Sequence, residues 1–136
     1  MGKHSEAALE GRWILIVEDD CVTAMDLAET LTAAGAQILG PATTLATAFE
    51  LLHRRPQVDI ALLDVEMEGE FVFGIADELV KREVPIVFTT GYERSEIPAR
   101  FKAARHCEKP VGIAAIARVL SDELSRRAPV VDGPRG

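Results

Sequence analysis

Cysteine, long apolar runs and a signal sequence are scarce or missing in this chain. Its 136 residues include two cysteines, and Cys21 and Cys107 show neither a CxxC motif nor the Cys/His spacing of a zinc site. Such usage argues against a disulfide scaffold and is typical of the reducing cytoplasm. No run approaches the ~20 apolar residues that span a bilayer, and residues 1–12 lack the apolar core of a signal peptide. These absences predict a cytoplasmic protein with no membrane insertion.

Positive charge is also in deficit. The chain has 15 Lys and Arg against 22 Asp and Glu, which gives a formal net charge of −7. A nucleic-acid binder needs a basic stripe to neutralise phosphates, so DNA is not an expected partner. The surplus of acid is compatible with a pocket that binds a divalent cation.

What the sequence does have is an alternation of short apolar runs and helical patterns. Apolar runs of this length are typical of strands buried on both faces, as in parallel sheets. The segment 92–105 contains Pro98 and scattered charges, which permit only a short or distorted helix. We expect strands at residues 13–17, 37–40, 60–63, 85–88 and 106–108, and helices at 24–34, 44–54, 74–83 and 113–124.

Strands that alternate with helices predict an α/β fold with right-handed crossovers. We expect a doubly wound, five-stranded parallel sheet with strand order 2-1-3-4-5, flanked by about five helices. The length suits one domain, which we assign to residues 12–127. Residues 1–11 are predicted to be a flexible N-terminus, and residues 128–136, which are rich in Pro and Gly, a disordered tail.

Polar side chains follow four of the five predicted strands. Residues 18–20 (Glu-Asp-Asp) follow the first strand, Asp64 the third, Thr90 the fourth and Lys109 the fifth. In such sheets, ligands bind at the carboxyl ends of the strands. Clustered carboxylates repel one another unless a cation is present, and Mg²⁺ prefers oxygen ligands. A carboxylate held beside Mg²⁺ can attack phosphorus as a nucleophile. Among the acids after the first strand, Asp20 is better explained as a helix N-cap than as part of this site.

These motifs resemble the receiver domain of two-component response regulators, the CheY-like family with a flavodoxin-like fold. The matching pieces are residues 16–20 (IVEDD), 62–64 (LLD), 90–91 (TG) and 109–110 (KP), in order and each at a strand end. Together they place the resemblance over about residues 12–127.

The resemblance implies a role for each residue at this edge. Asp64 would be the phosphoacceptor and also a metal ligand, and Asp19 a direct metal ligand. Glu18 would reach the Mg²⁺ through water, and Glu66 would offer its backbone carbonyl. Thr90 would be the switch hydroxyl and Lys109 the invariant lysine, which is usually followed by a cis peptide bond to proline.

Three departures from the family pattern stand out. The loop at residues 65–74 lacks the usual proline and is about two residues longer. His106 occupies the place of the aromatic residue before Lys109. Residues 85–92 (PIVFTTGY) resemble the signature PFxFATG[GY] of an atypical "FAT GUY" subfamily, which often occurs as stand-alone receivers. In that subfamily the output face would involve the segment 92–105 and the longer loop.

The expected function is that of a single-domain response regulator. A sensor histidine kinase or a histidine phosphotransfer protein would phosphorylate Asp64 with Mg²⁺, and an unknown downstream protein would read the result, since few residues follow Arg127. The protein would not be an enzyme beyond its own phosphorylation and autodephosphorylation. Two alternatives stay open: a degenerate receiver that binds a partner without phosphorylation, and a small Mg²⁺-dependent aspartyl phosphohydrolase, which usually has Asp where this chain has Glu66.

Overall fold

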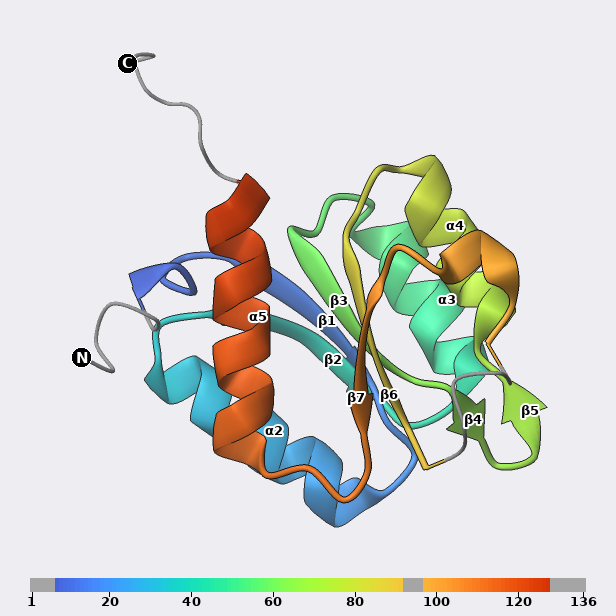
Figure 1. Cartoon of the computed structure of the whole chain (residues 1–136), viewed down its shortest axis with the longest axis horizontal. Helices are drawn as coiled ribbons and strands as arrows, with labels where there is room; N and C mark the ends of the chain where they lie inside the picture. The colour runs from blue at the N-terminus through green and yellow to red at the C-terminus, as the bar shows by residue number, and fades with distance from the viewer. Residues whose placement is uncertain (1–6, 92–96, 128–136) are drawn as a thin grey trace.

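The computed structural model describes residues 7–91 and 97–127, which form a five-stranded main sheet with helices on both sides (Figure 1) and a separate two-stranded one. The strands of the main sheet are β1 (Trp13–Val17), β2 (Gln37–Ala42), β3 (Ile60–Asp64), β6 (Ile86–Thr90) and β7 (Arg105–Glu108). The α-helices are α2 (Cys21–Ala33), α3 (Leu45–Arg54), α4 (Phe73–Lys81) and α5 (Ile113–Arg127). Two short strands, β4 (Glu66–Met67) and β5 (Glu70–Phe71), and the 3₁₀ helix η2 (Ala99–Phe101) complete the described elements.

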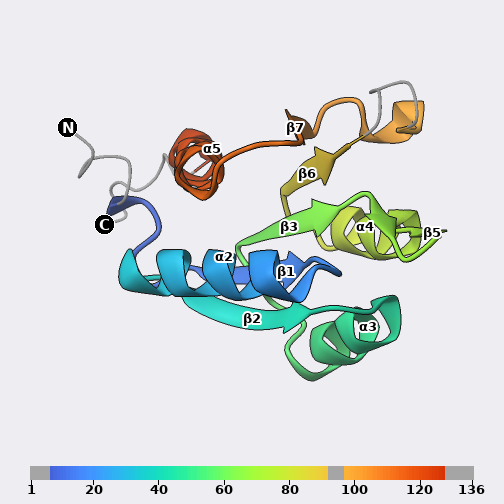
Figure 2. The ribbon, with the colours of Figure 1, turned by 90° about the horizontal axis from the view of Figure 1, so that it is seen from below.

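The five-stranded sheet is parallel and has the order β2-β1-β3-β6-β7. This is the predicted order 2-1-3-4-5, because β4 and β5 pair only with each other. The predicted fold class is therefore confirmed. Figure 2 shows the same sheet turned by 90°, with the twist that parallel strands accumulate.

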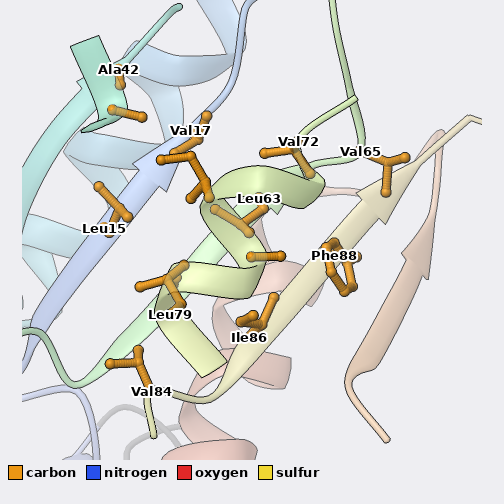
Figure 3. Packing of buried hydrophobic residues seen from close by; sticks show 14 of the residues in the cluster. Leu15, Val17, Ala42, Leu63, Val65, Val72, Leu79, Val84, Ile86 and Phe88 are labelled. Atoms are coloured by element: carbon orange, nitrogen blue, oxygen red, sulfur yellow. The ribbon is translucent and has the colours of Figure 1, made fainter. Parts of the chain in front are cut away.

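Two apolar clusters hold the helices against the two faces of the sheet. One face packs under α3 and α4, and Figure 3 shows side chains of β1, β3 and β6 gathered beneath α4. The opposite face packs under α2 and α5. Every residue of β3 and β6 is buried, which explains why these strands are apolar without alternation. The sheet is thus fixed from both sides, and its strand ends are left to form a site.

The helices differ in number from the expectation. The described residues hold four α-helices rather than about five. In the segment 92–105, the structure has the three-residue η2, which agrees with the short or distorted helix expected there. Residues 92–96, including Tyr92 of the predicted signature, lie outside the described residues.

Strand β2 continues through Pro41, where the sequence suggested that it would end. Proline lacks the N–H that a central strand needs, but β2 lies at the edge of the sheet, where proline is tolerated. The preceding Gly40 has φ +107°, and a Cβ there would meet the backbone nitrogen of Ala42 at 2.7 Å. The strand therefore bends at Gly40 and then returns to pair with Val17 through Ala42.

The predicted long loop after Asp64 contains a β-hairpin, at the lower right of Figure 1. Glu66 pairs with Phe71, and Met67 with Glu70. The turn between them has positive φ at Glu68 (51°) and Gly69 (84°), the pattern of a type I′ turn.

Part of the predicted flexible N-terminus is packed into the fold. Leu9 is fully buried in the cluster beneath α2 and α5. Gly11 donates its N–H to the carbonyl of Gly35 at 2.8 Å, which ties this segment to the end of α2. The packed structure thus starts before residue 12, while residues 1–6 and the predicted tail at 128–136 lie outside the described residues. Among the described helices, none is long and apolar enough to cross a membrane.

We expect Leu9→Ala to lower the free energy of unfolding by about 2 kcal/mol, because it leaves a cavity in a fully buried position. Val22→Ala is the control: Val22 is 70 % exposed, so its truncation is expected to change stability by less than about 0.5 kcal/mol. Urea unfolding of the three proteins makes the comparison. Equal stability of Leu9→Ala and wild type would show that the segment does not belong to the folded unit.

Candidate functional site

Strands β1 and β3 bring three carboxylates together at one edge of the sheet. Glu18 and Asp19 directly follow β1, and Asp64 is the last residue of β3. One carboxylate oxygen from each of these residues lies within 4.8 Å of the other two. Glu18 and Asp64 are each 4 % exposed, while Asp19 is half-buried. The structure therefore gathers the three acids that the sequence predicted as metal ligands through their side chains.

Asp20 caps α2, as expected, and is not one of the three converging acids. Its carboxylate accepts hydrogen bonds from the N–H of Thr23 at 2.9 Å and from the Thr23 hydroxyl at 2.6 Å. These bonds hold the pKa of Asp20 below its usual value. The N–H of Asp20 in turn donates to Oε2 of Glu18 at 3.1 Å. The start of α2 thus orients Glu18 toward the neighbouring acids.

Lys109 supplies the positive charge of the site. Its Nζ lies 2.9 Å from Oδ2 of Asp64 and 3.7 Å from Oε1 of Glu18. The Lys109 N–H donates to the carbonyl of Thr90 at 2.8 Å, so the ends of β6 and β7 are fixed to each other. The Lys109–Pro110 peptide bond is cis, as the resemblance implied.

Burial makes the negative charges costly. Desolvation raises the pKa of Glu18 to about 7, with a further contribution from the charge of Asp64. Desolvation also raises the pKa of Asp64, although the hydrogen bond and the charge of Lys109 act in the opposite direction. Desolvation lowers the pKa of Lys109, but the bond to Asp64 and the three nearby carboxylates outweigh it, so that the net shift is upward. The single positive charge of Lys109 therefore only partly neutralises the negative charge of the three acids.

The donor set fits Mg²⁺. Oxygen atoms of three carboxylates converge from two strands, and hard cations of this kind take carboxylate oxygens while retaining water. Burial raises the pKa of Glu18 and of Asp64, which means that their ionised forms are disfavoured where water is scarce. A divalent cation at this position would remove that cost.

Two further predicted site residues, Thr90 and Glu66, are not among the three converging carboxylates. Thr90 is the last residue of β6 and is 1 % exposed, and its carbonyl accepts the hydrogen bond from the Lys109 N–H. Glu66 lies in β4, and its carboxylate is not one of the three that converge. The metal contact of the Glu66 backbone carbonyl stays a prediction. His106, in place of the expected aromatic, stacks on Phe88 with ring centroids 5.7 Å apart.

One contact at the site was not anticipated. The N–H of Glu68 donates to Oδ2 of Asp19 at 2.9 Å, across 49 positions of sequence. Gly69 lies in a polar loop, and a glycine there is a general signal for a turn. A two-residue strand on either side is too short to be read from periodicity, so the sequence suggested only a longer loop.

Comparison with known proteins decides the family. The model of the response regulator receiver domain matches residues 14–120. The chain belongs to this receiver family. The matched range falls inside the predicted domain of residues 12–127 and contains all the site residues described above.

Curated relatives of this receiver are longer proteins. It is 32% identical over 128 residues to the transcriptional regulatory protein PdtaR of Mycobacterium tuberculosis, covering 90% of this chain and 60% of that one. It is 31% identical over 114 residues to the phyllosphere-induced regulator PhyR of Methylorubrum extorquens, covering 82% and 43%. The chain thus spans between two fifths and three fifths of the length of these relatives.

A solved receiver domain has the same fold. The solution structure of the receiver domain of the PhyR response regulator from Erythrobacter litoralis superposes with a TM-score of 0.76 at 25% identity. The match covers 92% of this chain and 99% of that one. The family and the fold are therefore established together, and two-component signalling is the class of function to which they belong.

We expect Glu18→Gln to stabilise the metal-free protein at pH 8 by about 1 kcal/mol, or a few degrees in Tm. The pKa of Glu18 rises from 4.5 to about 7 on folding. The folded state therefore holds the proton more tightly, and the ionised group destabilises it increasingly as pH rises through this range. The gain is expected to shrink at pH 5. Thermal unfolding in EDTA at both pH values measures it, and a loss of stability at pH 8 would contradict the electrostatic account.

Proposed function

We propose that this receiver accepts a phosphoryl group on Asp64 in the presence of Mg²⁺ and signals through the resulting change at its strand ends. The observation that carries the proposal is the pairing of Asp64 with Lys109 at 2.9 Å inside a cluster of three convergent carboxylates. A carboxylate nucleophile, a cation site and a fixed ammonium group are the parts that phosphoryl transfer to an aspartate needs.

The chemistry assigned to Asp64 is a substitution at phosphorus. One carboxylate oxygen forms the new O–P bond while the P–N bond to a donor histidine breaks, and the histidine nitrogen keeps the electron pair and takes a proton. Lys109 lies where its ammonium can neutralise phosphoryl oxygens as well as Asp64. Glu18, Asp19 and Asp64 would hold Mg²⁺ with the Glu66 carbonyl, and the metal supplies charge neutralisation to the phosphoryl oxygens.

The proposed response involves the end of β6. A phosphoryl group adds negative charge and acceptor oxygens, to which the Thr90 hydroxyl and the Lys109 ammonium would be drawn. Their backbones are already joined by the 2.8 Å hydrogen bond, so movement of one affects the other. A bistable loop after β6 would then be biased by the phosphorylation state.

The partners follow from this chemistry. We propose a sensor histidine kinase or a histidine phosphotransfer protein as the donor, in the cytoplasm, and a downstream protein that binds the phosphorylated form. The stand-alone organisation and membership of the FAT GUY subfamily remain predictions based on residues 85–92. The protein would have no turnover substrate beyond its own aspartyl phosphate, which is the difference from a phosphohydrolase.

The test is phosphorylation by acetyl phosphate and by phosphoramidate, measured by intact mass. We expect wild type to gain one labile phosphoryl group with Mg²⁺ and none in EDTA, and Asp64→Asn to gain none. Asp26→Asn is the matched control, because Asp26 is exposed on α2 away from the acid cluster. Its gain is expected to equal that of wild type.

Two results would contradict the proposal. The absence of phosphorylation from both donors, in a protein that binds Mg²⁺, would favour a binding module that acts without phosphorylation. Phosphorylation that persists in Asp64→Asn would place the acceptor elsewhere. Sustained release of phosphate from small esters would instead indicate a phosphohydrolase.

A further inference from the structure

The β4–β5 hairpin is fastened at both of its ends. At its base, Val72 donates its N–H to the carbonyl of Val65 at 2.9 Å, and both side chains are fully buried members of the apolar cluster drawn in Figure 3. Met67 also points into this cluster. At its tip, the N–H of Glu68 donates to Oδ2 of Asp19 at 2.9 Å. The base is therefore held by the apolar core, while the tip is held by one of the acids of the functional site.

The bond at the tip reaches Asp19, which is thereby held from a different element than the other two acids. Glu18 accepts the N–H of Asp20, and Asp64 is bonded to Lys109. Asp19 is held instead from the hairpin. An ionised carboxylate has two oxygens and about four acceptor positions. A single N–H can therefore fix the rotation of the Asp19 carboxylate and leave oxygen free for a cation.

We call the hairpin closed when the N–H of Glu68 is bonded to Asp19. We propose that the Glu68–Gly69 turn positions the metal ligand Asp19, so that the closed hairpin and a divalent cation at the acid cluster stabilise each other. The inference rests on the proposed function, because it concerns the regulation of the same site. Linkage makes the coupling reciprocal: if closure of the hairpin tightens cation binding, the cation favours closure by the same factor.

The charges of the hairpin and of the acid cluster decide whether a bound cation favours or disfavours closure of the hairpin. The hairpin carries Glu66, Glu68 and Glu70, and its tip is bonded to a cluster of three acids. Like charges make closure costly when no cation is present. A cation at the cluster lowers this repulsion, so the closed hairpin is favoured when the site is loaded.

A row of aromatic side chains connects the hairpin to the protein surface and to β6. Phe71, at the end of β5, is 50 % exposed and stacks on Phe73 with centroids 5.5 Å apart. Phe73 stacks on Phe101 at 5.6 Å, and Phe101 contacts Phe88 of β6 at 5.6 Å. This aromatic row joins the hairpin to the strand that ends in Thr90. The state of the acid site therefore determines how firmly an exposed aromatic side chain is held.

The hydrogen bond between the Glu68 N–H and Asp19 is tested in the absence of metal, by amide hydrogen exchange followed by NMR in EDTA. Asp19→Ala removes the acceptor, and we expect exchange at the Glu68 amide to accelerate about tenfold, as for the loss of one hydrogen bond to a charged acceptor. The Val72 amide is the internal control, because its acceptor is the Val65 carbonyl; its exchange is expected to stay unchanged. Unchanged exchange at Glu68 would overturn the proposal.

The coupling is tested with Gly69→Val by calorimetric titration with Mg²⁺. Gly69 has φ +84°, and an added Cβ meets nothing within 4 Å, so the substitution strains the turn without a clash. We expect Mg²⁺ affinity to fall about fivefold, because valine is β-branched and a left-handed backbone conformation is costly for it. We also expect Mg²⁺ to protect the Glu68 amide in wild type but much less in the variant. Glu68→Asp keeps the N–H and the charge, and Asp tolerates positive φ, so its affinity is expected to remain within about twofold of wild type.

The outcomes separate this inference from the proposed function. Equal Mg²⁺ affinity of Gly69→Val and wild type would overturn the coupling and leave the receiver chemistry intact. A wild type that binds no Mg²⁺ would overturn the proposed metal site and the coupling together. In that case the exchange experiment on Asp19→Ala would still decide whether the turn is fastened to Asp19.

Discussion

The repulsion between carboxylates at the ends of two buried strands is the constraint on which this structure depends. Glu18 and Asp64 are almost fully buried, and both have raised pKa values because water is largely excluded from them. An apolar core alone would not place charge there. The cost is offset by Lys109, by the N–H groups of Asp20 and Glu68, and, as we propose, by a cation when the protein is active.

The fold serves this cluster by fixing strand ends rather than by building a deep cavity. Apolar layers on both faces clamp β1, β3 and β6, so that the last residues of these strands have little freedom. The register then sets the chemistry: Asp64 pairs with Thr89, and Thr90 pairs with Glu108, the residue before Lys109. Because each strand ends at the same edge, small changes in charge there act on several elements at once.

The sequence was sufficient for the elements that obey local rules with buried partners. Apolar runs indicated β1, β3 and β6, and the acids that end two of these strands indicated Glu18, Asp19 and Asp64, whereas β7 (RHCE) has no apolar run and was predicted only from its place before Lys109-Pro110. The errors lie where tertiary context overrides local preference. Pro41 is accommodated because β2 is an edge strand, and Leu9 is buried by a helix pair that no local pattern reveals. The hairpin could not be predicted, because its strands have two residues each and its tip is held by Asp19, which is distant in sequence.

The central claim is that the acids of β1 and β3 form a divalent cation site. Titration of the ¹⁵N-labelled protein with Mg²⁺, followed by amide chemical shifts, tests it most directly. The account predicts saturable shifts concentrated at residues 18–20, 64–68 and 109, which are lost in Asp19→Asn. Shifts that are absent, that do not saturate, or that are spread over acidic residues elsewhere on the surface would contradict it.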